Sequence, residues 1–481
     1  MGCDTICDLP DSLLTQILLS LPTKDSVKTS VLSTRWRNLW LSVPGLDLHS
    51  SHFGSSEVLV RFMDRFMEFN QGSCLHIMRH IAASNSLNRE NYNNIDRLME
   101  LIGTVVDRGI QHLEVFIYCL TMHNLCGNFN LPVPGCRCYR CVSIYPGCRY
   151  YLPRQNIYNS KTLVSLKLLN VELPYPECAV SLPSLKIMTL SKVFYDRDGP
   201  LILEKLISGC PVLEDLLLCL PYDIFNESDH VVVLFLRVSS QSLKKCRLGF
   251  PNCRIHTDFT VEIDAPRLEH LSLARSRSDR IVVKNLSSLL KIDLLSFEKG
   301  SSFESGALRE RDFLANISSV RHMLICRNTL EVLYSYSKLG LIPKFHNLYH
   351  LKASFSSSLQ LLPPLLESCP NLKILSLLDS YRSEKPRQID FTNVPRCLIS
   401  SLENVEIKKQ MMTDETGIIK LVNYFLENSA VLKKLTLDFF KDTSITNQEA
   451  ESYKKLITSA KLSLTCQVII DITQCSKKRS R

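Results

Sequence analysis

The sequence predicts an α/β protein in which three short N-terminal helices precede an irregular solenoid with a parallel sheet. Two observations predict this fold. Apolar residues recur at helical spacing between Asp8 and Leu41, and a short apolar motif returns about every 27 residues from Leu163 to Leu432. A chain of 481 residues is too long for one compact globule, so several domains or a repeat array are expected.

The N-terminal segment reads DLPDSLLTQILLSLPTKDSVKTSVLSTRWRNLWL from residue 8. One face of a helix is indicated by Leu13, Leu14, Ile17, Leu18 and Leu21. Pro10 suits the first turn, Pro22 ends this helix, and Thr23 is expected to cap the next one. A second apolar stripe runs over Val27–Trp40, with an interruption near Ser33. About forty residues cannot hide so much apolar surface, so part of it must be buried against something else.

These residues resemble an F-box, and the stretch SVLSTRWRNLW is especially close to the plant form. In that family a three-helix motif docks on a Skp-type adaptor, which a cullin and its RING partner link to a ubiquitin-loaded enzyme. The resemblance implies adaptor contacts by Leu9, Pro10, Leu13, Ile17, Leu18, Val31, Leu32, Trp36 and Leu39. The alternative is a helical cap that packs on the rest of the chain, and periodicity does not decide which residues face outward.

From residue 110 the chain repeats the pattern Leu-x-x-Leu-x-Leu at intervals of 21 to 31 residues after Leu163. The copies begin at Ile110, Leu163, Leu185, Leu213, Leu243, Leu268, Leu289, Val320, Leu348, Leu372, Leu402 and Leu432. This period is typical of leucine-rich repeats, whose units bury their apolar edges only by stacking into a parallel sheet. The Asn or Cys usual at the ninth position is replaced, for example by Val171 and Phe440, so an irregular solenoid is expected.

The end of the chain is similar to the FBD region of plant F-box proteins. The similarity rests on residues 395–407, 422–428 and 432–435, whereas the usual Tyr-x-Gly element is absent. The predicted organisation is residues 5–45 as F-box, 46–109 as helical connector, 110–390 as repeats, 391–465 as FBD-like terminal repeats and 466–481 as basic tail. Helices are expected in the connector at Ser56–Phe69 and Ile95–Val106.

An irregular insert at residues 119–148 interrupts the repeats and holds six cysteines: Cys119, Cys126, Cys136, Cys138, Cys141 and Cys148. Cys-x-Cys-x-x-Cys could supply zinc thiolates, but paired Cys-x-x-Cys spacing is missing. Val115–Tyr118 is echoed by Val142–Tyr145, and removal of the residues between the echoes would restore one normal repeat. An exposed loop or an error of gene prediction is therefore favoured over a metal site.

Catalytic signatures such as HExxH, G-x-S-x-G and the phosphate-binding loop are absent, so neither an enzyme nor a cofactor is expected. The net charge of +9 is scattered, which does not favour nucleic-acid binding. No apolar run reaches the length of a membrane span and no signal peptide is evident, so the 19 cysteines are expected to be reduced thiols in cytoplasm or nucleus. Residues 477–481 are a nuclear address or a frayed basic end.

The predicted function is a non-catalytic substrate receptor of a Skp-cullin-F-box ubiquitin ligase, with leucine-rich repeats that recruit an unknown target protein. The alternatives are a leucine-rich-repeat scaffold not coupled to ubiquitination and a zinc-dependent nucleic-acid binder. Because the three leucines of each motif point into the core, its third and fifth positions are expected on the concave face. The candidates there for target binding are Lys167, Lys245, Arg247, His270 and Ser272.

Overall fold

A computed structural model describes residues 6–70, 75–84, 92–119, 150–152, 156–195, 199–220, 234–250, 259–274, 281–295, 313–338, 340, 342–355, 362–379, 393–409, 415–439 and 461–472. The contacts within the chain define an N-terminal unit, Met1–Pro266, and a C-terminal unit, Arg267–Arg481. The predicted insert, most of its cysteines and the basic end of the chain lie outside the described residues.

The N-terminal unit begins with two short helices, α1 (Asp11–Leu19) and α2 (Thr23–Lys28), followed by 3-10 turns at Thr29–Val31 and Leu39–Ser42. Pro22, not Thr23, is the N-cap of α2, and this corrects the predicted cap. The Thr23 hydroxyl instead accepts a hydrogen bond from the Asp47 backbone N–H at 2.8 Å. The third helix implied by the resemblance is replaced by turns and a 3-10 helix, since the apolar stripe breaks near Ser33 as predicted.

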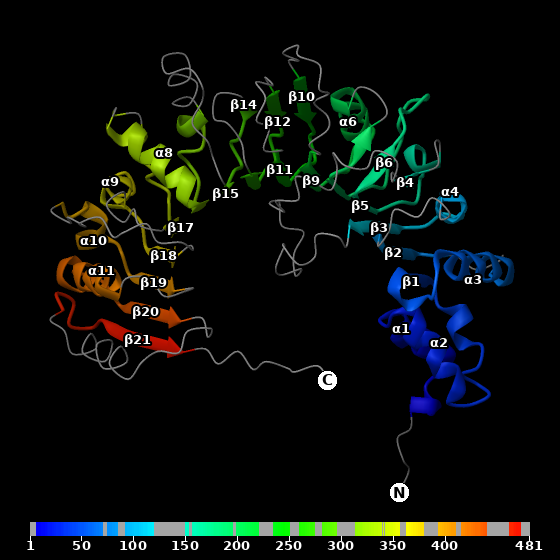
Figure 1. The fold of residues 1–481 in the computed structure, drawn as a ribbon. Helices are drawn as coiled ribbons and strands as arrows, with labels where there is room; N and C mark the ends of the chain where they lie inside the picture. Colours follow the sequence, from blue (N-terminus) through cyan, green and yellow to red (C-terminus); the bar gives the residue numbers. More distant parts are fainter. Residues whose placement is uncertain are drawn as a thin grey trace, which may run out of the picture. The chain divides into compact units, whose positions relative to one another are not determined.

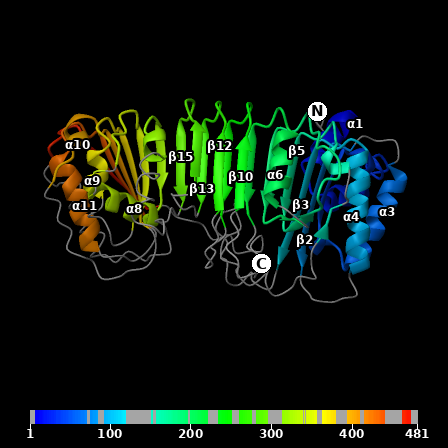
Figure 2. The ribbon, with the colours of Figure 1, turned by 90° about the horizontal axis from the view of Figure 1, so that it is seen from above.

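A parallel sheet runs through the N-terminal unit in the order β1-β2-β3-β5-β7-β9-β11. Its strands are β1 (Gly45–His49), β2 (Ile77–Ser84), β3 (His112–Cys119), β5 (Ser165–Leu169), β7 (Ile187–Ser191), β9 (Asp215–Cys219) and β11 (Lys245–Gly249). The helices α3 (Ser56–Phe69), α4 (Tyr92–Asp107) and α6 (Gly199–Ser208) lie along one side of this sheet (Figure 1; Figure 2). The predicted helix at Ser56–Phe69 is confirmed, and the second predicted helix extends to Tyr92–Asp107.

Short strands form additional pairings away from the main sheet of this unit. β4 (Tyr150–Tyr151), β6 (Val171–Leu173) and β8 (Phe194–Tyr195) make one small parallel sheet, and β10 (Leu234–Ser239) pairs with β12 (Phe259–Asp264). These short strands lie in segments that connect consecutive strands of the main order, where other repeats have a helix. This variation agrees with the irregular solenoid predicted from the replaced ninth position.

The parallel strands of the C-terminal unit follow in the order β13-β15-β16-β17-β18-β19-β20-β21. Its strands are β13 (His270–Ala274), β15 (Lys291–Leu295), β16 (His322–Ile325), β17 (His350–Phe355), β18 (Ile374–Asp379), β19 (Asn404–Lys409), β20 (Lys434–Phe439) and β21 (Gln467–Ile472). A short strand, β14 (Ile281–Asn285), lies outside this order. One side of the sheet carries α8 (Arg327–Lys338), α9 (Leu362–Glu367), α10 (Arg396–Ser400) and α11 (Glu415–Asn428) (Figure 1).

Every predicted copy of the repeat motif produces a strand that begins two residues after its first apolar residue. In the motif copy that contains β5, for example, Leu163, Leu166 and Leu168 are buried, whereas Lys167 is partly exposed. The prediction of a repeated parallel strand is therefore confirmed. Apolar side chains at the first, fourth and sixth positions build the core between strands and helices. The third and fifth positions define what we term the open face of each unit.

Three strands of the main sheet order were not predicted. The motif is degenerate in β2 and β21, whereas β1 follows the intact pattern Val43-x-x-Leu46-x-Leu48. β1 and β2 lie in the predicted helical connector, and β21 takes up residues 467–472 of the predicted basic tail. The β2 copy begins at Leu75 but has His80 where the last leucine is expected, and the β21 copy begins at Thr465. The remaining predicted domain boundaries stay predictions.

Candidate protein-interaction surfaces

The F-box segment has a small core of its own. Leu14, Leu18, Trp36, Leu39 and Val43 form one buried cluster, with Leu9 and Leu19 packed against it. Three of the nine residues predicted to contact an adaptor, Leu18, Trp36 and Leu39, are thus in the interior, and Leu9 is partly buried. These side chains hold the helices together, because burial of each such side chain contributes about 2 kcal/mol to the free energy of folding.

The other predicted contact residues are on the surface. Leu13 and Ile17 of α1 are 43% and 40% exposed, and Val31 and Leu32 at the turn after α2 are 85% and 64% exposed. Pro10 is also exposed. Leu21, which was not predicted as a contact, is exposed as well, although its helical spacing from Leu13 and Ile17 could have indicated it. We term Leu13, Ile17, Leu21, Val31 and Leu32 the docking surface.

Arg35 ties the two parts of this segment together. Its guanidinium Nη2 lies 2.6 Å from Asp11 Oδ1 at the start of α1, and Nη2 also donates to the Leu9 carbonyl. The Ser26 hydroxyl of α2 donates to the Leu18 carbonyl at 3.0 Å. These hydrogen bonds join α1, α2 and the turn near Arg35. They therefore hold the backbone segments that carry the docking surface in one arrangement.

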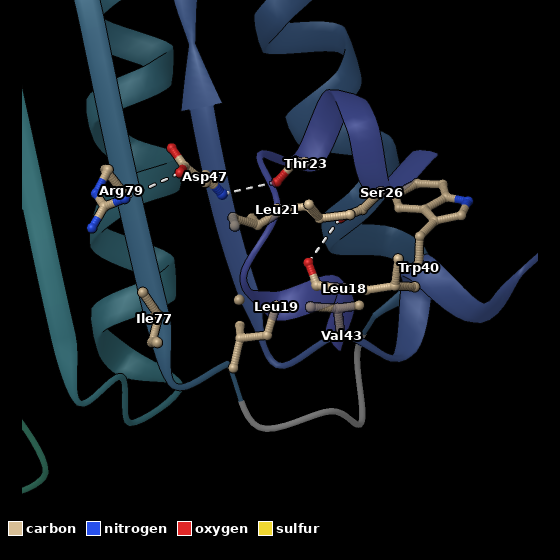
Figure 3. A pocket seen from close by; sticks show the side chains of 12 residues that line it. Leu18, Leu19, Leu21, Thr23, Ser26, Trp40, Val43, Asp47, Ile77 and Arg79 are labelled. Atoms are coloured by element: carbon tan, nitrogen blue, oxygen red, sulfur yellow. Dashed lines mark hydrogen bonds and ion pairs between the residues drawn. The ribbon is translucent and has the colours of Figure 1, made fainter. Parts of the chain in front are cut away.

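The F-box segment is packed against the first strands and α3. The Trp40 ring lies 6.2 Å from the rings of both Phe62 and Phe66. A cavity of about 90 Å³ lies between α1 and α2 on one side and β1 and β2 on the other (Figure 3). Its lining residues are Leu18, Leu19, Leu21, Thr23, Ser26, Trp40, Val43, Gly45, Leu46, Asp47, Ile77 and Arg79. The stacking of Trp40 on α3 therefore fixes the F-box segment relative to α3.

The open face of the N-terminal unit carries a ladder of charges in register. Asp47, Arg79, Glu114 and Lys167 face one another on β1, β2, β3 and β5. The Glu114 carboxylate forms ion pairs with Arg79 at 2.6 Å and with Lys167 at 2.7 Å. Arg79 also forms an ion pair with Asp47 at 3.1 Å. Burial pushes the pKa of Glu114 upward, but hydrogen bonds from Lys167 and Arg79 outweigh it and leave that pKa below its usual value.

This ladder changes how the predicted target-binding residues are interpreted. Lys167 is part of the ladder, and Arg247 pairs with Asp215 of the neighbouring strand at 2.7 Å. Lys245 is exposed on the same face. Lys167 and Arg247, two of the three cations predicted to bind a target in this unit, are therefore paired with acids of the same chain. Sequence spacing could not show this pairing, because the acids lie on other strands.

The open face of the C-terminal unit has a different pattern. Four basic side chains lie side by side in register on adjacent strands, and we term them the basic row: His270, Lys291, His322 and His350. His270 Nε2 lies 2.7 Å from Asp293 Oδ2, and Lys291 Nζ lies 3.6 Å from the same oxygen. The predicted contact Ser272 lies two residues after His270 on β13, opposite Asp293, and only 6% of its surface is exposed.

The described residues hold no group of three metal-ligating side chains, and the predicted zinc pattern lies outside them. No described helix is long and apolar enough to cross a membrane. Several described cysteines are buried free thiols, among them Cys246 of β11. Burial raises the pKa of the Cys246 thiol to about 12, so this side chain acts as a small apolar core residue, as its place in the motif predicted.

Comparison with known proteins assigns families to the two ends and the middle of the chain. The F-box domain family matches residues 6–47, the LRR repeats of an FBD-associated F-box protein match 142–297, and the FBD family matches 389–437. Among similar Arabidopsis thaliana proteins, one F-box/FBD/LRR-repeat protein is 54% identical over 478 residues and covers 98% of this chain and 99% of its own length. Another is 51% identical over 480 residues, with 98% and 100% covered. The chain therefore belongs to the plant F-box/FBD/LRR-repeat family.

Proposed function

We propose that the protein is a non-catalytic substrate receptor of a Skp-cullin-F-box ubiquitin ligase. F-box proteins are generally substrate adaptors of ubiquitin ligases, and their F-box domains generally bind Skp-type adaptors. In this chain the F-box would hold the adaptor while the open faces of the repeats would hold a target protein. We propose the cytoplasm or nucleus as its place of action.

The observation that supports this proposal most strongly is the exposure of the docking surface. The F-box segment buries Leu14 and Leu18 in its own core, yet leaves Val31 and Leu32 largely in water. Neighbouring exposed apolar residues of this size are typical of a surface that a partner covers. A scaffold with a purely structural F-box would have no need of such residues.

No chemistry by the receptor itself is required. A ubiquitin-loaded enzyme held on the same assembly would meet target lysines at a high effective concentration, so positioning alone would raise the rate of transfer. The packing of Trp40 against Phe62 and Phe66 supports this proposal, because it would transmit the position of the adaptor to the first strands.

The proposal is tested by capture of a purified Skp-type adaptor and a cullin on the tagged full chain. The double variant Val31→Ser, Leu32→Ser removes the two most exposed residues of the docking surface. We expect it to bind the adaptor about a hundredfold more weakly, since each buried aliphatic side chain contributes about 1.5 kcal/mol or more. Its unfolding midpoint should match that of the wild type.

The matched control is Leu462→Ser, Leu464→Ser, which removes two similarly exposed residues of the C-terminal unit, 54% and 96% exposed. This control should capture the adaptor as the wild type does. Failure of the wild-type chain to capture any Skp-type adaptor, or equal capture by the Val31 and Leu32 variant, would contradict the proposal and leave a scaffold function.

A further inference from the structure

The two open faces differ in how their basic side chains are compensated. In the N-terminal unit, Arg79 and Lys167 share Glu114, and Arg247 has Asp215. In the C-terminal unit, the basic row and the adjacent Lys352 of β17 are five basic side chains near two carboxylates, Asp293 and Glu406, and Glu406 is paired with Lys408. We propose that the basic row binds an acidic segment of the target protein, with carboxylate or phosphate groups as the anions. This inference rests on the proposed function, because it names the chemistry of the target that the receptor would hold.

The basic row is continuous because the strands that carry it are paired in register. His270 is opposite Lys291, Lys291 is opposite His322, and His322 is opposite His350. Neighbouring strands are about 4.8 Å apart, so the row extends for about 14 Å. An extended peptide covers that distance with about four or five residues. The row therefore fits a short acidic segment that crosses the strands.

The basic row is reachable from solvent. His322 is exposed, and the Lys291 side chain is 46% exposed. The rings of His322 and His350 lie edge to face with their centroids 6.1 Å apart, and His350 Nε2 is 3.1 Å from the Ser376 hydroxyl. These contacts order the imidazoles without covering them, which reduces the entropy that a ligand would have to remove on binding.

Nearby acids do not neutralise the row. Asp293 is shared by His270 and Lys291. Glu406 of β19 is engaged by Lys408, which lies 3.0 Å from it. Among the described residues, no ion pair joins Lys352 or His322 to an acid. The surface thus keeps a local excess of positive charge, which favours an anionic partner.

The histidines make the expected binding dependent on pH. Burial lowers the pKa of His350, and the charges of His322, Lys352 and Lys291 lower it further, while Glu406 opposes this. A bound anion would favour the protonated imidazole, so peptide affinity should rise as the pH falls from about 7.5 to about 6. Nucleic acid is the less favoured ligand, because the row has only two lysines, with Lys352 counted, and no arginine.

The test uses the full chain in complex with its Skp-type adaptor and three fluorescein-labelled probes of equal length. These are a Glu-rich peptide, the same peptide with phosphoserines in place of glutamates, and single-stranded RNA. Binding is measured by fluorescence anisotropy near pH 7.5 and pH 6. The variant Lys291→Gln, His322→Gln, Lys352→Gln removes the accessible positive groups but leaves His270 on Asp293 and His350 on Ser376. Its matched control is His76→Gln, Lys161→Gln, Lys186→Gln, an exposed histidine and two exposed lysines of the N-terminal unit.

We expect the wild-type chain to bind at least one acidic peptide, more tightly at the lower pH, and the row variant to bind it about tenfold more weakly. The control variant should keep wild-type affinity. Preference for the Glu-rich or the phosphorylated peptide would identify the source of the anion. Wild-type affinity in the row variant, an equal loss in the control, or binding of RNA alone would overturn the inference. Adaptor capture, measured in parallel, distinguishes this failure from failure of the receptor function.

Discussion

His80 provides a sharp test of how the N-terminal unit is held together. It occupies the position in β2 where the repeat motif expects a leucine, and its side chain is fully buried. Neither ring nitrogen has a hydrogen-bond partner. Burial, with a smaller contribution from the charge of His49, lowers the pKa of His80 to about 4 from 6.5. The folded unit therefore requires the neutral imidazole.

The direction of the pH dependence follows from this shift. Because the unfolded chain binds a proton on His80 more tightly than the folded chain does, stability is fully present above about pH 6.5 and decreases as the pH falls toward 4. Linkage between pKa values of 6.5 and about 4 gives a loss of about 2 kcal/mol at pH 5. A domain has a free energy of unfolding of only about 5 to 15 kcal/mol, so this loss is readily measured.

The comparison is between the wild type and His80→Leu, which restores the apolar residue of the motif. Urea unfolding followed by tryptophan fluorescence reports on the N-terminal unit alone, since the chain has only two tryptophans, Trp36 and Trp40. We expect the advantage of the variant over the wild type to grow by about 2 kcal/mol from pH 7.5 to pH 5. His49→Gln serves as the control for the neighbouring imidazole. Parallel pH profiles of wild type and His80→Leu would refute a buried neutral His80.

Three further substitutions test the packing of the N-terminal unit, each by the same fluorescence-detected unfolding. Gly209→Ala should destabilise it by about 2 kcal/mol or more, because an added Cβ would lie 2.6 Å from the Val180 carbonyl oxygen; an unchanged midpoint would show that the return relaxes freely. Glu114→Gln should cost about 1 to 2 kcal/mol by leaving Lys167 without its carboxylate, and the cost should shrink in high salt; a salt-independent loss would point to packing instead. Trp36→Ala should cost about 3 to 5 kcal/mol, since this ring fills the F-box core; a cost below 1 kcal/mol would place the ring outside it.

The repeat strands could be predicted because their signal is local. Leu163, Leu166 and Leu168 alternate with residues that point the other way, and this alternation alone specifies both the strand and its buried face. β2 escaped prediction because His80 replaces the last apolar residue of its motif, and an imidazole gives no hydropathy signal for burial. His80 is thus the residue at which β2 departs from the repeat motif, and its burial is the reason for the expected loss of stability at low pH.

The surfaces could be predicted only in part, because burial depends on contacts between distant segments. Ile17 and Leu18 are adjacent apolar residues of one short helix, yet Leu18 is buried against Trp36 and Ile17 faces water. Periodicity indicates a stripe but not which edge of it a neighbour covers. The pairing of Arg247 with Asp215 likewise depends on strand register, and the sequence places these residues 32 positions apart.

Hydrogen–deuterium exchange of the full chain, with and without a purified Skp-type adaptor, tests the central claim most directly. If the docking surface holds the adaptor, peptides that cover α1 and the turn through Val31 and Leu32 should exchange more slowly in the complex. The strands that carry the basic row should be unchanged. Protection confined to the repeats, or no protection at all in a chain that retains its fold, would contradict the assignment of Leu13, Ile17, Leu21, Val31 and Leu32 as the adaptor contact.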